Sequence, residues 1–105
     1  MCDFKVWSRT DDNVFVMQCT HCNFYQIRMN HLCLIYSDDD YRKFQDYIND
    51  AFDMLQSGEK DMFVIPTLNG EMNILLNKAE LKKMFMLMDS ADTEIQAARL
   101  ASMFF

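Results

Sequence analysis

Four consecutive residues, Cys19-Thr20-His21-Cys22, have the types and spacing most suited to chemistry. Two cysteines around a tight turn can direct both thiolates at one metal ion, as in half of a zinc ribbon. Asn23 follows, and asparagine tolerates the left-handed backbone conformation that glycine often supplies in such turns. A four-coordinate zinc site needs two further ligands, so other residues would have to come close to this pair.

His31 and Cys33 are the next candidates along the chain, and the expected strand pairing separates them from the first pair. A two-residue turn at 29–30 between neighbouring strands places Cys33 opposite Gln26 and His31 opposite Arg28. Cys33 then lies ~13 Å along the strand from the first pair, whereas a zinc–sulfur bond is ~2.3 Å. We therefore expect neither residue to complete a zinc site.

We favour no metal and no other cofactor, with zinc as the alternative. The ligands of that alternative are Cys19, Cys22, His21 and Cys2. Because this set is incomplete without a terminus that folds back, we expect less than one equivalent of zinc in the purified protein. The simpler interpretation is that Cys19, Cys22 and Cys33 are small, partly buried hydrophobic residues.

Enzymatic uses of these cysteines have little support in the pattern. Disulfide exchange favours a cysteine at a helix start, where the dipole lowers the thiol pKa, and here the motif joins two expected strands. Nucleophilic catalysis needs a base beside the thiol, and no spacing brings His21 or His31 into that role. We therefore lean towards a protein that is not an enzyme.

The elements expected around this motif are those of an α+β fold: an antiparallel β-meander, a helix, a β-hairpin and a C-terminal helix, with the helices on one face of the sheet. Runs rich in β-branched and aromatic residues predict the meander. Its strands are expected at Phe4–Ser8, Val14–Gln18, Phe24–Met29 and Leu32–Tyr36, with turns at Thr10–Asn13, Thr20-His21 and Met29-Asn30.

Ser37 is a suitable N-cap for the first helix, and the three aspartates that follow it favour the positive end of the helix dipole. This helix is expected to run to about Ser57, with Gly58 as the residue after its end. Its apolar stripe is Tyr41, Phe44, Ile48, Ala51 and Leu55, and Tyr36 and Tyr41 form a hydrophobic staple.

A hairpin is expected next, with strands Met62–Thr67 and Glu71–Leu76 around a type I′ turn at Asn69-Gly70. Pro66 lacks a backbone donor, which places its strand at a sheet edge or at a bulge.

The C-terminal helix begins at Asn77, and Glu80 completes a capping box. Leu76 and Leu81 form a second staple. Asp89–Asp92 is compatible with a kink or with two separate helices, and the pattern does not choose between them.

The segment CTHCNFYQIRMNHLCLIYSDDDYRKF resembles the opening of short uncharacterised bacterial domains. These domains combine a CxxC with an aromatic strand, a tight turn, an apolar strand and an acidic helix. The later hairpin and C-terminal helix also fit, so the resemblance covers most of the chain. It supports the fold and implies no known activity.

Composition narrows the remaining functions. The 105 residues predict one domain, 1–105. Two glycines are too few for phosphate-binding loops, and a net charge of −6 argues against nucleic acid as a partner. Residues 37–61 hold eight acidic and three basic residues, as expected of a solvated helix face. The start lacks a signal-peptide pattern and no apolar run is long enough for a membrane span, so we expect a cytoplasmic protein.

The C-terminal helix carries more apolar residues than one packed face requires. Ile95, Ala98, Leu100, Ala101, Met103 and Phe104 lie around more than one side of it. We therefore expect a small interaction or structural domain that forms a homo-oligomer, most simply a dimer, through this helix. The alternative is a metal-binding or thiol-responsive regulator that uses Cys19 and Cys22.

Overall fold

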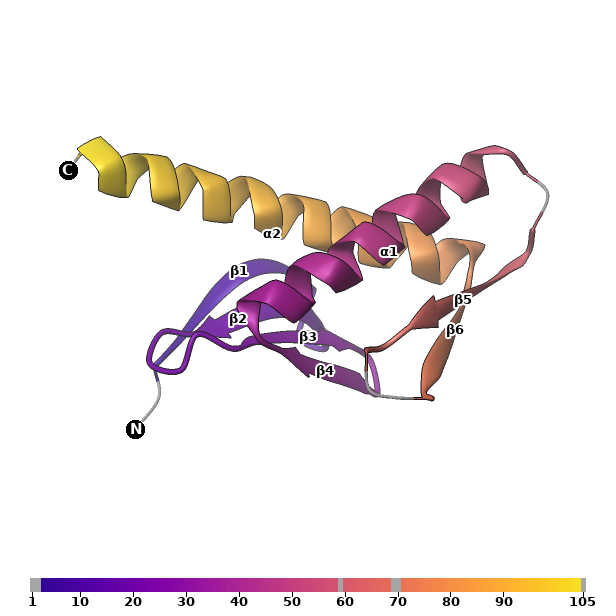
Figure 1. The fold of residues 1–105 in the computed structure, drawn as a ribbon, viewed down its shortest axis with the longest axis horizontal. Helices are drawn as coiled ribbons and strands as arrows, with labels where there is room; N and C mark the ends of the chain where they lie inside the picture. The colour runs from indigo at the N-terminus through magenta and orange to yellow at the C-terminus, as the bar shows by residue number, and fades with distance from the viewer. Residues whose placement is uncertain (1–2, 59, 69–70, 105) are drawn as a thin grey trace.

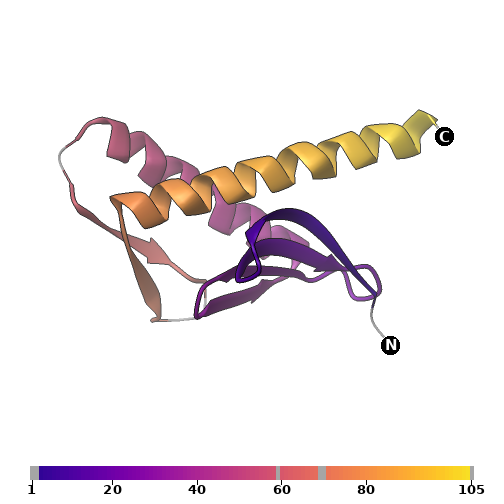
Figure 2. The same cartoon turned by 180° about the vertical axis from the view of Figure 1, so that it is seen from behind.

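The computed structural model of this chain describes residues 3–58, 60–68 and 71–104 (Figure 1). The fold is α+β, as predicted. Both helices lie on one side of the strands, as the two opposite views show (Figures 1 and 2). In chain order the elements are β1 (Phe4–Asp11), β2 (Val14–Cys19), β3 (Tyr25–Met29), β4 (Leu32–Tyr36), α1 (Asp38–Gln56), β5 (Met62–Pro66), β6 (Asn73–Asn77) and α2 (Lys78–Phe104).

The predicted meander is confirmed as a four-stranded antiparallel sheet in the order β1-β2-β3-β4. One face of this sheet packs into the core. The buried side chains on this face include Val14, Val16, Ile27 and Leu34, and they alternate along the strands with side chains on the other face. The strand β1 is longer than expected, since it continues to Asp11, and its register with β2 shifts twice.

The β2–β3 and β3–β4 connections both differ from the predicted turns. Met29 pairs with Leu32, so the turn lies at Asn30-His31, and Asn30 adopts φ 58°. This moves Cys33 opposite Arg28 instead of Gln26. The reason is that Met29 is an inward-facing core residue, 5% exposed, whereas asparagine tolerates the left-handed region. The connection from β2 to β3 spans residues 20–24 and is therefore not the two-residue turn expected at Thr20-His21.

The β5–β6 hairpin forms a separate two-stranded sheet. Pro66 therefore lies in an edge strand, as predicted, and the pairing of β5 with β6 is regular. The expected turn at Asn69-Gly70 lies outside the described residues. Tyr36 at the end of β4 donates its hydroxyl hydrogen to the carbonyl oxygen of Thr67, which joins the two sheets.

Both helix starts are confirmed. The Ser37 hydroxyl accepts a hydrogen bond from the Asp40 amide at 3.3 Å. At the second helix the Asn77 amide donates to Glu80 at 2.9 Å, and the Glu80 amide donates to the Asn77 side chain at 2.8 Å. This is the reciprocal capping box that the spacing predicts.

The helix α2 is continuous from Lys78 to Phe104, so the kink or division at 89–92 does not occur. Ala91 is fully buried in the middle of that segment, and its packing keeps the helix regular. The buried residues of α2 are Leu81, Met84, Leu87, Met88, Ala91 and Ile95. None of the described helices is long and apolar enough to cross a membrane.

The capping box yields a stability prediction. Asn77→Ala removes the acceptor for the Glu80 amide and should lower the free energy of unfolding by about 1 kcal/mol. Urea unfolding measures this change, and Lys82→Ala, on the exposed side of the same helix, is the control that should cost much less. An unchanged unfolding midpoint in Asn77→Ala would show that the cap contributes nothing to the fold.

Candidate functional site

The Cys19–Cys22 segment forms a tight loop between β2 and β3. The Cys22 amide points at the Cys19 Sγ with an N···S distance of 3.5 Å. Asn23 adopts φ 60°, as its sequence position suggested, and its amide donates to the Cys19 carbonyl at 2.9 Å. The Cys19 amide donates in turn to the Phe24 carbonyl at 2.9 Å. The loop is therefore closed around the Cys19 sulfur by backbone hydrogen bonds.

The N-terminal segment is attached to this loop. The Thr20 amide donates to the Asp3 carbonyl at 2.8 Å, and the Thr20 hydroxyl donates to the same oxygen at 3.1 Å. Cys2, the further candidate ligand, precedes Asp3 in the sequence and lies outside the described residues.

An apolar pocket of about 240 Å³ lies beside the two cysteines. Cys19 is buried and Cys22 is exposed. Besides the two cysteines, the pocket is lined by Phe4, Phe24, Tyr25, Gln26 and Ile35. These residues come from the ends of β1, β3 and β4 and from the loop, so the sheet edge and the loop form the pocket together.

The other candidate residues lie elsewhere. His31 is in the β3–β4 turn, and Cys33 accepts a hydrogen bond from the Gln26 side chain at 3.1 Å. Among residues 3–58, 60–68 and 71–104, no three His, Cys, Asp or Glu side chains come together as a metal site. Cys22 and Cys33 are exposed, so the prediction that they are partly buried is wrong for both.

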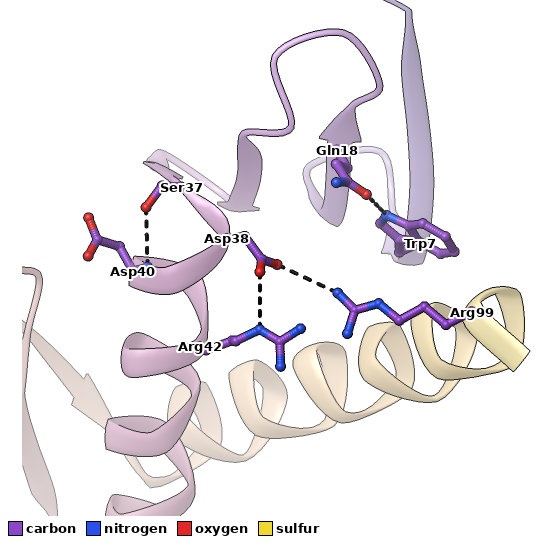
Figure 3. A network of polar contacts seen from close by, with 7 residues as sticks. All are labelled: Trp7, Gln18, Ser37, Asp38, Asp40, Arg42 and Arg99. Atoms are coloured by element: carbon purple, nitrogen blue, oxygen red, sulfur yellow. Dashed lines mark hydrogen bonds and ion pairs between the residues drawn. The ribbon is translucent and has the colours of Figure 1, made fainter.

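A polar cluster between the two helices escaped the sequence analysis. Asp38 accepts a hydrogen bond from the Arg42 Nε at 3.3 Å and lies 3.7 Å from the guanidinium of Arg99 (Figure 3). These contacts join the first turn of α1 to the last third of α2. The cluster combines residues 61 positions apart in the sequence, and no local pattern indicates such a contact.

Two stacked tyrosines lie beside Asp38. The rings of Tyr25 and Tyr41 are 4.3 Å apart, and they border a small cavity of about 30 Å³. The Tyr41 hydroxyl is buried without a hydrogen-bond partner in the described part of the chain. Burial, more than the neighbouring phenol and carboxylate, raises the pKa of Tyr41. Burial followed by the charge of Asp38 likewise raises the pKa of Tyr25.

The last turns of α2 form an exposed apolar surface. Leu100 is 57% exposed, and Met103 and Phe104 are each 77% exposed. Figures 1 and 2 show this end of the helix extending past the sheet. Of the surplus apolar residues predicted for the C-terminal helix, Ile95 is buried in the core, whereas Leu100, Met103 and Phe104 are not.

The sequence of this chain matches a family of unknown function, DUF6686, over residues 1–103. The chain belongs to the DUF6686 family. Membership of an uncharacterised family agrees with the resemblance seen in the sequence, and the family brings no known activity with it. No curated protein and no solved structure matches this DUF6686 member.

The two buried tyrosine hydroxyls should respond differently to removal. Tyr36→Phe deletes the hydrogen bond to the Thr67 carbonyl and should lower the free energy of unfolding by about 1 kcal/mol. Tyr41→Phe deletes a hydroxyl without such a partner and should leave the stability unchanged or raise it. Urea unfolding at pH 7 compares the two, and a larger loss in Tyr41→Phe than in Tyr36→Phe would contradict this assignment.

Alkaline pH should destabilise the fold through Tyr36. Burial, with a smaller effect of the Asp40 charge, raises the pKa of Tyr36 to about 12 from its usual 10.0. Between these values the unfolded chain loses a proton that the folded chain retains, so stability falls as pH rises from 10 towards 12. Unfolding midpoints at pH 9 and pH 11 test this, since the decline should be shallower in Tyr36→Phe than in the exposed control Tyr47→Phe.

Proposed function

We propose that this protein is a small non-enzymatic interaction domain whose partner is a second copy of itself. The observation that carries the proposal is the exposed apolar side of α2, which ends in Leu100, Met103 and Phe104. A helix that covers a sheet needs one apolar stripe, and α2 has in addition a line of uncharged residues, with Met86 at one end and Leu100 and Phe104 at the other, that the described part of the chain leaves exposed.

This line has the spacing of a helix–helix seam. Its residues, separated alternately by four and three positions, are Met86, Ser90, Thr93, Ala97, Leu100 and Phe104. All six are exposed, and none is charged. At 100° per residue this line lies roughly opposite the buried line through Met88, Ala91 and Ile95. The alternation of four and three is the repeat by which paired helices pack side by side.

The seam fits an antiparallel copy of itself better than an unrelated surface. Its bulky residues, Leu100 and Phe104, are at the C-terminal end, and its small residues, Ser90 and Thr93, lie one to two turns earlier. A two-fold axis near Ala97 therefore places Phe104 of one copy over Ser90 of the other, and Leu100 over Thr93. Two-fold pairing of this kind is the commonest symmetry of small oligomers.

In the proposed dimer, the bulky C-terminal end of the seam of one copy lies in an open groove of the other. It has a volume of about 530 Å³ and lies between β1 and α2, with Trp7, Ser90 and Ala97 among its lining residues. In the antiparallel arrangement Phe104 of the second copy enters this groove beside Trp7. The Trp7 indole is already held in place by a 3.0 Å hydrogen bond to Gln18 (Figure 3).

The distribution of charged residues is compatible with the pairing of two copies along α2. Within residues 95–104 the single charged residue is Arg99, whose guanidinium already contacts Asp38 of its own chain. The exposed acids Asp46, Asp50 and Asp53 lie in the later part of α1, whose end is far from the C-terminus of α2 (Figure 1). Like-charge repulsion between two copies paired along α2 is therefore weakened by distance and by salt.

Substitutions on the seam test the proposal. Leu100→Asp and Phe104→Asp should convert a dimer to a monomer, because each places a charge in an apolar contact. Ser102→Asp is the matched control, since it adds the same charge to an exposed position on the opposite side of the helix. Sedimentation velocity between 1 and 500 μM, roughly the range of weak small-domain dimers, measures the change.

Cross-linking tests the position of the two-fold axis. The Ala97→Cys chain should form a disulfide-linked dimer on mild oxidation, and the Ser102→Cys chain should form much less. A monomer at all concentrations, or equal cross-linking by the two variants, would contradict association through this seam.

A further inference from the structure

The Cys19–Cys22 loop has no role in the association through α2. Strand alternation places Cys19 on the same side of the sheet as Phe15 and Met17, away from Val14 and Val16, which face the core. Both helices cover the other side (Figures 1 and 2). The loop and its pocket therefore form an independent site on the uncovered side of the sheet.

We propose that Cys19 and Cys22 bind one thiophilic metal ion, Cu(I), through their two sulfur atoms. On binding, each thiol loses its proton to solvent and forms one Cu–S bond, so two protons are released and the copper keeps its oxidation state. Soft thiolate sulfur is the ligand type that favours Cu(I), zinc and iron–sulfur clusters over hard cations, and of these Cu(I) is the one suited to two sulfur donors.

The backbone of the loop favours the ionised sulfur. The Cys22 amide points at the Cys19 Sγ at 3.5 Å, and an amide donor stabilises negative charge on the atom it faces. A cysteine binds a metal as the thiolate, so this contact favours metal binding by Cys19. The same contact places the sulfur of the first cysteine beside the backbone amide of the second.

The loop is also held in place before any metal arrives. Asn23 occupies the left-handed region, and its amide bonds to the Cys19 carbonyl. Thr20 is attached to Asp3 by two hydrogen bonds. A loop that is already ordered loses little conformational freedom on binding, which increases the affinity for a small ion.

The surroundings discriminate between metals. Within the described part of the chain, the residues that line the pocket beside the cysteines are mainly apolar and aromatic, Phe4, Phe24 and Ile35 among them, and include no carboxylate or histidine. Hard cations require oxygen ligands, and structural zinc requires four donors. Cu(I) is satisfied by two thiolates, and the buried Cys19 and the exposed Cys22 both line this pocket.

A titration of the full-length chain tests the proposal. Reduced protein is titrated anaerobically with Cu(I) in competition with a colorimetric Cu(I) chelator. We expect one equivalent of Cu(I) per chain, with two sulfur scatterers in the copper X-ray absorption spectrum. Cys22→Ser should abolish the stoichiometric binding, and because Cys22 is exposed the variant should keep the wild-type circular dichroism spectrum and unfolding midpoint.

Cys33→Ser is the matched control, since Cys33 is an exposed cysteine of the same sheet that does not line this pocket. It should bind Cu(I) like the wild type. The proposal is overturned if Cys22→Ser still binds one equivalent, or if Cys33→Ser loses binding to the same degree. It is also overturned if Cys2→Ser removes binding completely, because the two-ligand site would then be incomplete, or if one equivalent of zinc displaces the copper.

Discussion

The short connections between strands and helices constrain everything else in this fold. A single residue, Ser37, separates β4 from α1, and α2 begins directly after β6. Each junction is closed by a side-chain cap that satisfies the first amides of the helix. Both helices therefore start at the ends of strands, and both lie on the same side of the strands (Figures 1 and 2). The contact of Asp38 with Arg99 lies where α2 passes the start of α1.

Local signals in the sequence predicted the elements and the helix starts, because caps and staples act within a few residues. The turns were less accurate. Asn23 and Asn30 have positive φ in the connections of the meander, and a pattern of polar interruptions does not show whether the turn includes the residue before or after such an asparagine. Continuity of α2 through Asp89–Asp92 depended on the burial of Ala91, which is a tertiary effect.

The candidate site was predictable only in part. The CxxC loop and its left-handed Asn23 are local, and the sequence identified both. The pocket beside the loop and the stacked tyrosines are not local, since their residues come from separate strands and from α1. The register also had to be known to one residue before Cys33 could be placed. Spacing along the chain carries no information about such contacts.

The position of α2 in the chain has a consequence for synthesis on the ribosome. The meander and the hairpin pair neighbouring segments, so they can form while the rest of the chain is still being made. The α2 residues that pack into the same core, Leu81, Met84, Leu87 and Met88, are translated after all of these strands. Until α2 emerges, Val14, Val16 and Ile27 lack the part of their cover that α2 supplies, and the nascent chain exposes apolar strand residues. The same helix that leaves one stripe uncovered in the finished protein thus decides when its folding can be completed.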